Sequence, residues 1–304
     1  MGGVGFIYDD IFLKHEPPQW HPERKDRLIH IVNILRATEL WSRLLHIPPR
    51  RARFEDIALA HTPEHIEKIK SIGTGCLDMD TFTSQDSLDA ALHAAGAVIE
   101  AVERCKTGDI SRAFCAVRPP GHHAEAHCAM GFCLFNNIAI GARYARMIGY
   151  ERVFIIDFDA HHGNGTQHIF EEDDTVFYFS THQYPYYPET GKDMERGKGK
   201  GEGFTYNVQI LTGSGNKEYL SVYQDIVPDL VRRFGPDLLL VSAGYDIHAD
   251  DPCADIRVTS DGIRGIVQSI LISSAAPVVF TLEGGYDLDA LAESVRITIE
   301  EMLK

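Results

Sequence analysis

Short apolar runs typical of β-strands alternate along this chain with segments of helical periodicity. The strand-like runs cover residues 4–8, 112–117, 153–157, 175–180, 205–208, 238–242 and 278–282. The helical patterns cover residues 22–35, 63–71, 87–104, 134–148, 217–234, 260–274 and 288–303. Such an alternation requires crossover connections, which build a mostly parallel sheet with helices on both faces. The sequence therefore predicts an α/β fold, and we expect residues 1–304 to form one domain.

Polar residues directly follow three of the predicted strands. Asp157 and Asp159 come at the end of VFIID, Asp246 follows LLLVSAGY, and the segment Gly284-Gly285-Tyr286 follows VVFTLE. In open parallel sheets, ligands bind in the crevice at the carboxyl ends of the strands. We therefore expect a functional site where these three strands end.

The charge balance limits the partners of the chain. Lys and Arg together number 29 against 44 Asp and Glu, which gives a formal net charge of -15. Nucleic-acid binding depends on a basic surface, so a direct nucleic-acid partner is not expected. An acidic surface steers cationic substrates better than anionic ones, although it is equally typical of proteins that are acidic only for solubility.

Cysteine usage and the N-terminal segment favour a reducing compartment. The six cysteines form no CxxC pair and no regular framework, which disfavours both a thiolate zinc site and a disulfide scaffold. The first residues, MGGVGFIYDD, lack the basic start of a secretory leader, and no apolar stretch approaches the ~18 residues of a membrane span. We expect a cytoplasmic protein without a membrane partner.

The segment RPPGHHAE contains two adjacent histidines, His122 and His123. Each imidazole has a donor and an acceptor that would need partners if the ring were buried. Carboxylate and amide side chains are concentrated in one downstream segment, IIDFDAHHGNG, which contains Asp157, His161 and Asn164. Together the two segments indicate the centre of a metal-dependent hydrolase.

Asp159 and His161 are two positions apart, so on an extended strand end their side chains project to the same side. Asp246 is the natural third ligand. An Asp-His-Asp set is typical of a catalytic zinc site with an open position, and its oxygen ligands also suit iron(II) or cobalt(II). Either aspartate alone is more simply read as a turn or helix cap, but the set together favours a metal.

Six motifs resemble those of the zinc-dependent histone deacetylase superfamily, including its class II and acetylpolyamine amidohydrolase branches. They are RPPGHHAE, GFCLFNNIAI, DFDAHHGNGTQ, STHQYPYYPETG, SAGYDIHADDP and LEGGYDLDALAESV. The resemblance implies the arginase–deacetylase fold, with an eight-stranded parallel sheet flanked by helices. It also implies an amidohydrolase that removes an acetyl or other acyl group from an acyl-lysine or acyl-amine by metal-activated water.

Transferred onto the matching positions, the resemblance also assigns roles. Asp159, His161 and Asp246 would be the metal ligands. His123 would be the main proton shuttle, oriented by Asn164, and His122 would bond to Asp157. Tyr286 would donate its phenol proton to the scissile carbonyl oxygen. The catalytic set is thus His122, His123, Asp157, Asn164 and Tyr286.

The resemblance further implies a substrate tunnel and a structural potassium ion. The tunnel would have Phe132 and Tyr187 as aromatic walls, Gly131 as floor and Cys253 at its mouth. The potassium ligands would be Asp157, the carbonyls of Asp159 and His161, the Ser180 hydroxyl and the Thr181 carbonyl. His162, next to a metal ligand, is expected to point away from the metal and to pack behind the site.

Alternative substrates and functions stay open at this point. Acetylpolyamine amidohydrolases of the eukaryotic branch carry a gatekeeper glutamate where this chain has Cys253, so an acyl-lysine substrate is favoured over a polyamine. Asp250 and Asp251 are nevertheless expected near the same rim, where they could attract a polyamine. A binuclear manganese ureohydrolase is a remote alternative, because it needs aspartate ligands where this chain has the two histidines. A non-catalytic binding protein is equally remote, since no residue of the set is missing.

Overall fold

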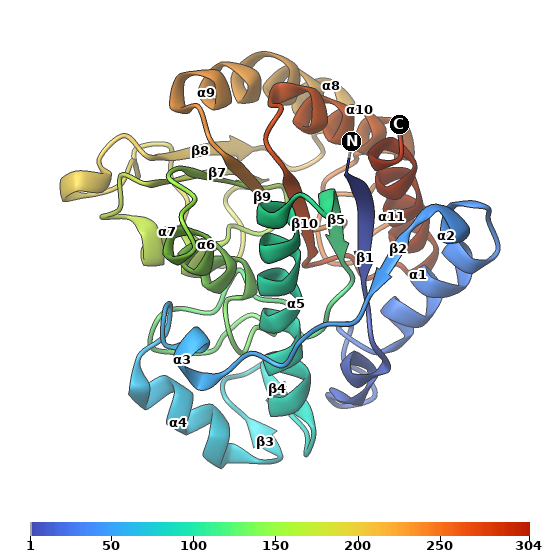
Figure 1. Cartoon of the computed structure of the whole chain (residues 1–304), viewed down its shortest axis with the longest axis vertical. Helices are drawn as coiled ribbons and strands as arrows, with labels where there is room; N and C mark the ends of the chain where they lie inside the picture. Colours follow the sequence, from blue (N-terminus) through green and yellow to red (C-terminus); the bar gives the residue numbers. More distant parts are fainter. Residues whose placement is uncertain (1) are drawn as a thin grey trace.

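The computed structural model describes residues 2–304, and its centre is an eight-stranded parallel sheet (Figure 1). The strands are β1 Gly3–Ile7, β2 Leu45–Ile47, β5 Ile110–Cys115, β6 Val153–Asp157, β7 Val176–Gln183, β8 Thr205–Ile210, β9 Leu238–Ala243 and β10 Val278–Leu282. Their order across the sheet is β2-β1-β5-β10-β9-β6-β7-β8. The predicted parallel α/β sheet is therefore confirmed.

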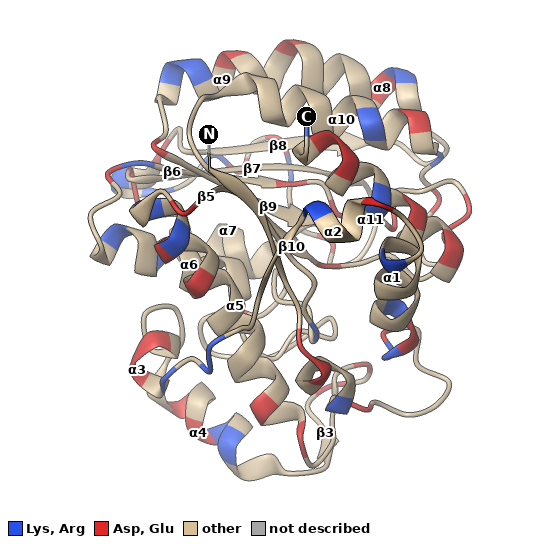
Figure 2. Ribbon diagram, turned by 45° about the vertical axis from the view of Figure 1, so that its right-hand side comes forward, with Lys and Arg blue, Asp and Glu red and all other residues tan. Residues whose placement is uncertain are grey.

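Helices cover both faces of this sheet, in two layers that can be followed in Figures 1 and 2. One layer contains α5 Ser87–Thr107, α6 Asn137–Met147 and α7 Asn164–Phe170. The other contains α1 Asp26–Arg36, α8 Asn216–Ser221, α9 Val227–Phe234, α10 Ser260–Ser273 and α11 Leu288–Met302. Because both faces are covered, central strands such as β6 and β9 are buried at every residue and consist mainly of apolar side chains.

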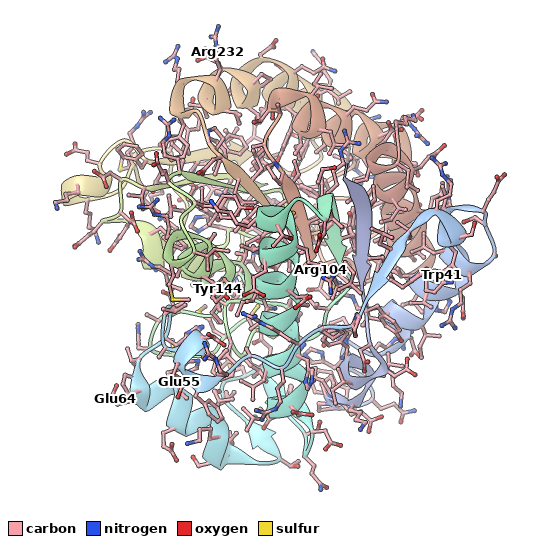
Figure 3. All side chains as sticks on the ribbon, viewed as in Figure 1. Trp41, Glu55, Glu64, Arg104, Tyr144 and Arg232 are labelled. Carbon is pink, nitrogen blue, oxygen red and sulfur yellow. The ribbon has the colours of Figure 1, made fainter. Side chains whose placement is uncertain are left out.

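Smaller elements precede α5 in the chain. They are a 3₁₀ turn Asp10–Lys14, α2 Leu40–Arg43, α3 Phe54–Ile57, α4 Pro63–Ile72 and the antiparallel pair β3 Gly75–Cys76 and β4 Phe82–Thr83. Charged residues are concentrated on helices and loops, whereas the strands contain few of them (Figure 2). Glu55, Glu64 and Arg232, for example, lie at the periphery and are exposed (Figure 3).

The elements differ from the prediction mainly at short or interrupted segments. The edge strand β2 was not predicted, because it has three residues and two of them are exposed. The predicted helix over 217–234 is divided into α8, a π-helical turn Val222–Ile226 and α9. Pro228, near the start of α9, has no backbone N–H and would clash with a carbonyl one turn earlier, which explains the irregular turn before it.

Two predicted helices begin later than expected. The first starts at Asp26 rather than at residue 22, and α6 starts at Asn137 rather than at residue 134. The side chain of Asn136 accepts a hydrogen bond from the backbone N–H of Ala139 and so caps α6. The sequence does not predict helix α7, because its seven residues, NGTQHIF, are mostly polar and too few to show a helical pattern of apolar residues.

The topology brings the chemical motifs together at one edge of the sheet. Strands β5, β10, β9, β6 and β7 are consecutive neighbours, and the predicted site residues lie near their carboxyl ends or in the segments that follow them. Among residues 2–304, no helix is both long enough and apolar enough to cross a membrane.

Candidate active site

Asp159, His161 and Asp246 meet beyond the ends of β6 and β9. Nδ1 of His161 lies 3.1 Å from Oδ1 of Asp159 and 2.9 Å from Oδ2 of Asp246. Within residues 2–304, these three residues form one group whose possible ligand atoms all lie within 4.8 Å of one another. Two carboxylates and an imidazole at this spacing match the three protein ligands of a catalytic zinc site.

Backbone donors hold both carboxylates in place. Asp159 accepts hydrogen bonds from the N–H groups of His161 (2.9 Å) and Gly284 (2.8 Å), and Asp246 accepts one from Ala160 (2.8 Å). Position 284 has no room for a side chain, because a Cβ there would lie 2.4 Å from Oδ2 of Asp246 and 2.6 Å from Oδ2 of Asp159. The ligand atoms of Asp159, His161 and Asp246 are thus held in position, and this arrangement fits a divalent metal ion such as zinc.

The charges of the cluster also suit a cation. Burial and the neighbouring Asp159 raise the pKa of Asp246 to about 7. Burial lowers the pKa of His161, but its bonds to Asp159 and Asp246 outweigh this effect and raise the pKa to about 10. Both shifts show that the two buried carboxylates favour positive charge between them, which a divalent ion supplies when bound.

His122 lies between two carboxylates. Its Nδ1 is 3.1 Å from Oδ2 of Asp157, which also accepts a hydrogen bond from the Tyr178 hydroxyl at 3.1 Å. Its Nε2 is 3.8 Å from Oδ2 of Asp159. The structure thus brings His122 together with Asp157, the partner that the family resemblance implied.

His123 has a neutral partner instead. Its ring centroid is 4.0 Å from that of His122, and its Nδ1 lies 2.8 Å from Oδ1 of Asn164. Gly131 packs directly against the ring, because a Cβ at this position would be 2.5 Å from Cδ2 of His123. The ring of Tyr187 contacts His123 edge to face, with centroids 5.2 Å apart.

These different partners separate the protonation states of the two histidines. Burial lowers the pKa of His122, but the charges of Asp159 and Asp157 outweigh it and raise the pKa to about 10. For His123, burial and the neighbouring His122 and His161 lower the pKa well below its usual value. Adjacent groups whose pKa values are pushed apart are suited to separate acid and base roles.

A pocket of about 380 Å³ opens onto this cluster. Its lining residues are Asp80, Pro120, His122, His123, Gly131, Phe132, His161, Tyr186, Tyr187, Cys253, Gly284 and Tyr286. All four residues of the predicted tunnel are in this set. Phe132 has a φ of 70°, a left-handed conformation that is uncommon for a bulky residue, and its N–H donates to the Thr81 hydroxyl at 3.1 Å.

Tyr286 enters the pocket from the loop after β10. Its ring lies edge to face with Phe132, with centroids 5.9 Å apart, and the guanidinium of Arg27 lies 5.0 Å from its centroid. Burial raises the pKa of the Tyr286 phenol well above its usual value, although the charge of Arg27 acts in the opposite direction. The phenol therefore keeps its proton at neutral pH and can act as a hydrogen-bond donor.

The residues predicted to bind potassium lie at the end of β6, directly after it, and within the neighbouring strand β7. Asp157 on β6 is paired in register with Ser180 on β7, and Thr181 follows. Asp157, Ser180 and Thr181 are fully buried, and the Ser180 hydroxyl lies 2.8 Å from Nδ1 of His182. The backbone of Asp159 and His161 continues directly from β6.

Glu283 is a site residue that was not predicted. Its buried carboxylate accepts hydrogen bonds from the N–H groups of Gly121 (2.7 Å) and His122 (3.2 Å) and from the Ser242 hydroxyl (3.1 Å). Burial raises its pKa to about 7. Glu283 thus links the end of β10 to the loop that carries His122 and His123. Its position directly after a predicted strand was the signal that could have identified it.

Asp80 and Tyr186 line the pocket without having been predicted. Asp80 belongs to the turn between β3 and β4, far in sequence from the motifs, and no local pattern pointed to it. The Tyr186 hydroxyl donates to the carbonyl of Cys253 at 2.9 Å. It thereby links the two segments that carry the predicted tunnel residues Tyr187 and Cys253.

The expectation that Asp251 supplies an acidic group at the rim is wrong, whereas the same expectation for Asp250 stays a prediction. Neither residue lines the pocket. Asp251 is buried, and its oxygens accept hydrogen bonds from the N–H groups of Cys253 (2.9 Å), Tyr286 (2.6 Å) and Asp287 (3.3 Å). The Asp250 side chain is exposed, with a carboxylate oxygen 3.6 Å from Nδ1 of His248. The acidic residue in the pocket lining is Asp80.

Comparison with known proteins agrees with this geometry. The family described as histone deacetylase domain matches residues 21–302 of the chain. The chain belongs to the histone deacetylase family. The suspected family, the α/β fold and the class of deacetylase hydrolases are therefore confirmed, and the ureohydrolase and binding-protein alternatives are disfavoured.

Individual members of the histone deacetylase family match nearly all of this chain. A probable deacetylase of Archaeoglobus fulgidus is 37% identical, over 94% of this chain and 82% of that protein. The human polyamine deacetylase HDAC10 is 34% identical over 100% of this chain, which spans 48% of the human protein. The crystal structure of the HDA15 HD domain has a TM-score of 0.96 at 35% identity, and the match covers 99% of this chain and 88% of that one.

Proposed function

We propose that residues 1–304 form a single catalytic domain that hydrolyses the amide bond of an acyl-lysine side chain or an acyl-amine. One observation carries the proposal: His161 of the ligand cluster opens into the same pocket as His122, His123 and Tyr286. One continuous hydrophobic core, with members from Val4 to Met302, supports the single domain.

In this proposal Asp159, His161 and Asp246 hold one zinc ion, with iron(II) or cobalt(II) as alternatives. The ion supplies Lewis acidity, which polarises the scissile carbonyl and makes the attacking water a stronger acid. The positions of the two carboxylates, which backbone N–H groups hold beside His161, support this assignment.

The tandem histidines would then handle the proton. His123 accepts the proton of the attacking water at Nε2, because its Nδ1 bonds to Asn164. The same proton passes to the amine nitrogen as the C–N bond breaks. His122, held by Asp157, stays protonated and stabilises the negative charge that develops.

The pocket walls would bind the linear part of the substrate. Phe132 and Tyr187 enclose an alkyl chain, which loses its hydration without needing hydrogen bonds. Gly131 leaves room beside His123, and Cys253 lies where the substrate enters. The presence of all four residues in one pocket supports this arrangement.

A structural potassium ion belongs to the same proposal. Its ligands would be Asp157, the carbonyls of Asp159 and His161, the Ser180 hydroxyl and the Thr181 carbonyl, all hard oxygens. The pairing of Asp157 with Ser180 supports it. The lack of a direct nucleic-acid partner stays a prediction that the net charge of -15 supports, and a cytoplasmic location stays a prediction that rests on the cysteine usage.

Two classes of substrate compete for the pocket. Cys253 offers no charge to a distal ammonium group, which favours acyl-lysine peptides. Asp80 in the pocket lining is a carboxylate that could pair with such a group, which favours acetylated polyamines.

The test is a panel of acetyl-lysine peptides, longer acyl-lysine peptides and acetylated polyamines, ranked by kcat/KM with the zinc-loaded protein. A protein that hydrolyses none of these amides would refute the proposal.

Replacing Cys253 with glutamate is expected to shift preference toward acetylated polyamines. The new carboxylate would pair with the distal ammonium, and such a rim pair contributes about 0.2–1 kcal/mol. The ratio of kcat/KM values for the two substrate classes should therefore change by a few-fold, up to roughly tenfold if the mouth excludes water. A wild-type protein that already prefers polyamines by roughly two orders of magnitude would contradict this ranking. Asp80→Asn would then identify the group responsible.

Replacing Tyr286 with phenylalanine is expected to lower kcat by roughly 10²–10³ with little change in KM. The phenol bonds the developing oxyanion more strongly than the ground-state carbonyl, and phenylalanine keeps the ring contacts with Phe132 and Arg27. Steady-state kinetics on one acyl-lysine peptide measure the effect. An unchanged kcat would show that another group polarises the carbonyl.

A further inference from the structure

Glu125, the last residue of RPPGHHAE, lies behind the candidate active site. Its side chain is 11% exposed, and its Oε1 accepts a hydrogen bond from Nδ2 of Asn164 at 2.5 Å. Nδ1 of His168, at 2.8 Å, is its second partner. Asn164 in turn places Oδ1 2.8 Å from Nδ1 of His123. A carboxylate, an amide and the pocket imidazole therefore form one hydrogen-bonded chain.

The order of donors in this chain depends on Glu125. An ionised carboxylate only accepts hydrogen bonds, whereas an amide can present either its oxygen or its NH₂ group. Glu125 therefore requires the NH₂ group of Asn164, and this leaves the amide oxygen to face His123. The other acceptors near Nδ2, the carbonyl of His123 and the sulfur of Met130, are both 3.4 Å away and bind too weakly to fix the amide.

The orientation of the amide decides the tautomer of His123. An oxygen opposite Nδ1 requires hydrogen on that nitrogen, so the neutral ring keeps a free lone pair on Nε2. A reversed amide would donate to Nδ1 and move the hydrogen to Nε2, where it would block a base. The carboxylate also polarises the amide, which strengthens the bond from Asn164 to His123.

A second chain of the same kind ends on a histidine outside the pocket. Glu195 accepts a hydrogen bond from Nε2 of Gln167 at 2.7 Å, and Oε1 of Gln167 lies 2.9 Å from Nε2 of His162. His162 is buried, its Nδ1 lies 2.7 Å from the Thr190 hydroxyl, and it does not line the pocket. This chain has the same chemistry but does not reach the pocket, which makes it a matched control.

We propose that Glu125 is a positioning residue that selects the Nδ1–H tautomer of His123 through Asn164. The catalytic consequence rests on the proposed function, in which His123 is the base. The tautomer itself is a property of the folded chain and can be measured without turnover.

The experiment compares imidazole ¹⁵N NMR signals of the zinc-loaded wild type with those of Glu125→Gln and Glu195→Gln, and the His123→Ala variant identifies the His123 signals. In wild type, Nδ1 of His123 should carry the hydrogen. In Glu125→Gln the new amide can face either way, so the Nε2–H form should appear, and kcat should fall roughly three- to tenfold at unchanged KM. Glu195→Gln should leave the His123 signals and kcat unchanged.

A rescue variant separates positioning from general damage to the fold. In the double variant Glu125→Gln, Asn164→Asp, the introduced carboxylate accepts from His123 directly and from the introduced amide, so the Nδ1–H form should return. A His123 tautomer that is unchanged in Glu125→Gln, or not restored in the double variant, would overturn the inference. If the tautomer responds as expected in a protein that hydrolyses no acyl-amide, the inference stands and the proposed function fails.

Discussion

Removal of the metal by a chelator is expected to abolish hydrolysis of every acyl-amide, and added zinc is expected to restore it. The side chains around the carbonyl cannot replace the lost Lewis acid, because the remaining donors, Tyr286 and protonated His122, are hydrogen-bonding groups. Asp246→Asn should have a similar effect. The amide keeps the shape of the side chain but loses the charge that, with Asp159, favours a cation at this point.

Metal content and turnover should be measured on the same samples. Asp250→Asn is the matched control, since this exposed aspartate is in the same loop after β9 but lies outside the pocket. It should retain both metal and activity. Turnover that survives complete chelation would refute the metal mechanism. Two metal ions per chain, about 3.5 Å apart, would favour the ureohydrolase alternative.

The central sheet could be predicted from sequence because its strands have a strong local signal. Val153–Asp157 and Leu238–Ala243 are buried on both faces, so they are apolar runs rather than alternating patterns. The edge strand Leu45–Ile47 has no comparable signal, since two of its three residues are exposed. Its pairing with β1 joins residues that are far apart in the sequence, so a local sequence pattern does not predict it.

Site residues could be predicted where they follow a strand or belong to a motif. Asp157 and Asp246 were found in this way, and Glu283 satisfied the same rule but was overlooked beside the more conspicuous Gly284-Gly285-Tyr286. Asp80 could not be found, because only the folded chain brings the β3–β4 turn to the pocket. A residue that is close in sequence to a pocket residue also need not point its side chain into the pocket.

Asp251 illustrates this last point. It is two residues from Cys253, which lines the pocket, yet its carboxylate faces inward to backbone donors. Its Oδ2 accepts hydrogen bonds from the N–H groups of Tyr286 and Asp287. Asp251 therefore stabilises the loop that carries Tyr286 and is not placed to bind a substrate amine. Asp251 is therefore close to the site, as expected, but its carboxylate does not face a substrate.

Replacement of His123 with alanine is expected to lower kcat by roughly 10²–10⁴, the range of a general acid–base catalyst. His123 is the neutral member of the pair, because its partner is the amide of Asn164 and the neighbouring His122 and His161 lower its pKa. His122→Ala should cost roughly tenfold less, since the carboxylates of Asp159 and Asp157 raise the pKa of His122 and, in the proposed mechanism, His122 contributes charge rather than proton transfer.

The comparison is informative only if both variants keep the metal and the fold. Neither histidine belongs to the Asp159–His161–Asp246 cluster, so the metal content of both variants should equal that of wild type. Single-turnover rates with an acyl-lysine peptide then separate chemistry from binding. If His122→Ala is the slower variant, His122 rather than His123 transfers the proton. Asp157, rather than Asn164, would then be the residue that orients the base.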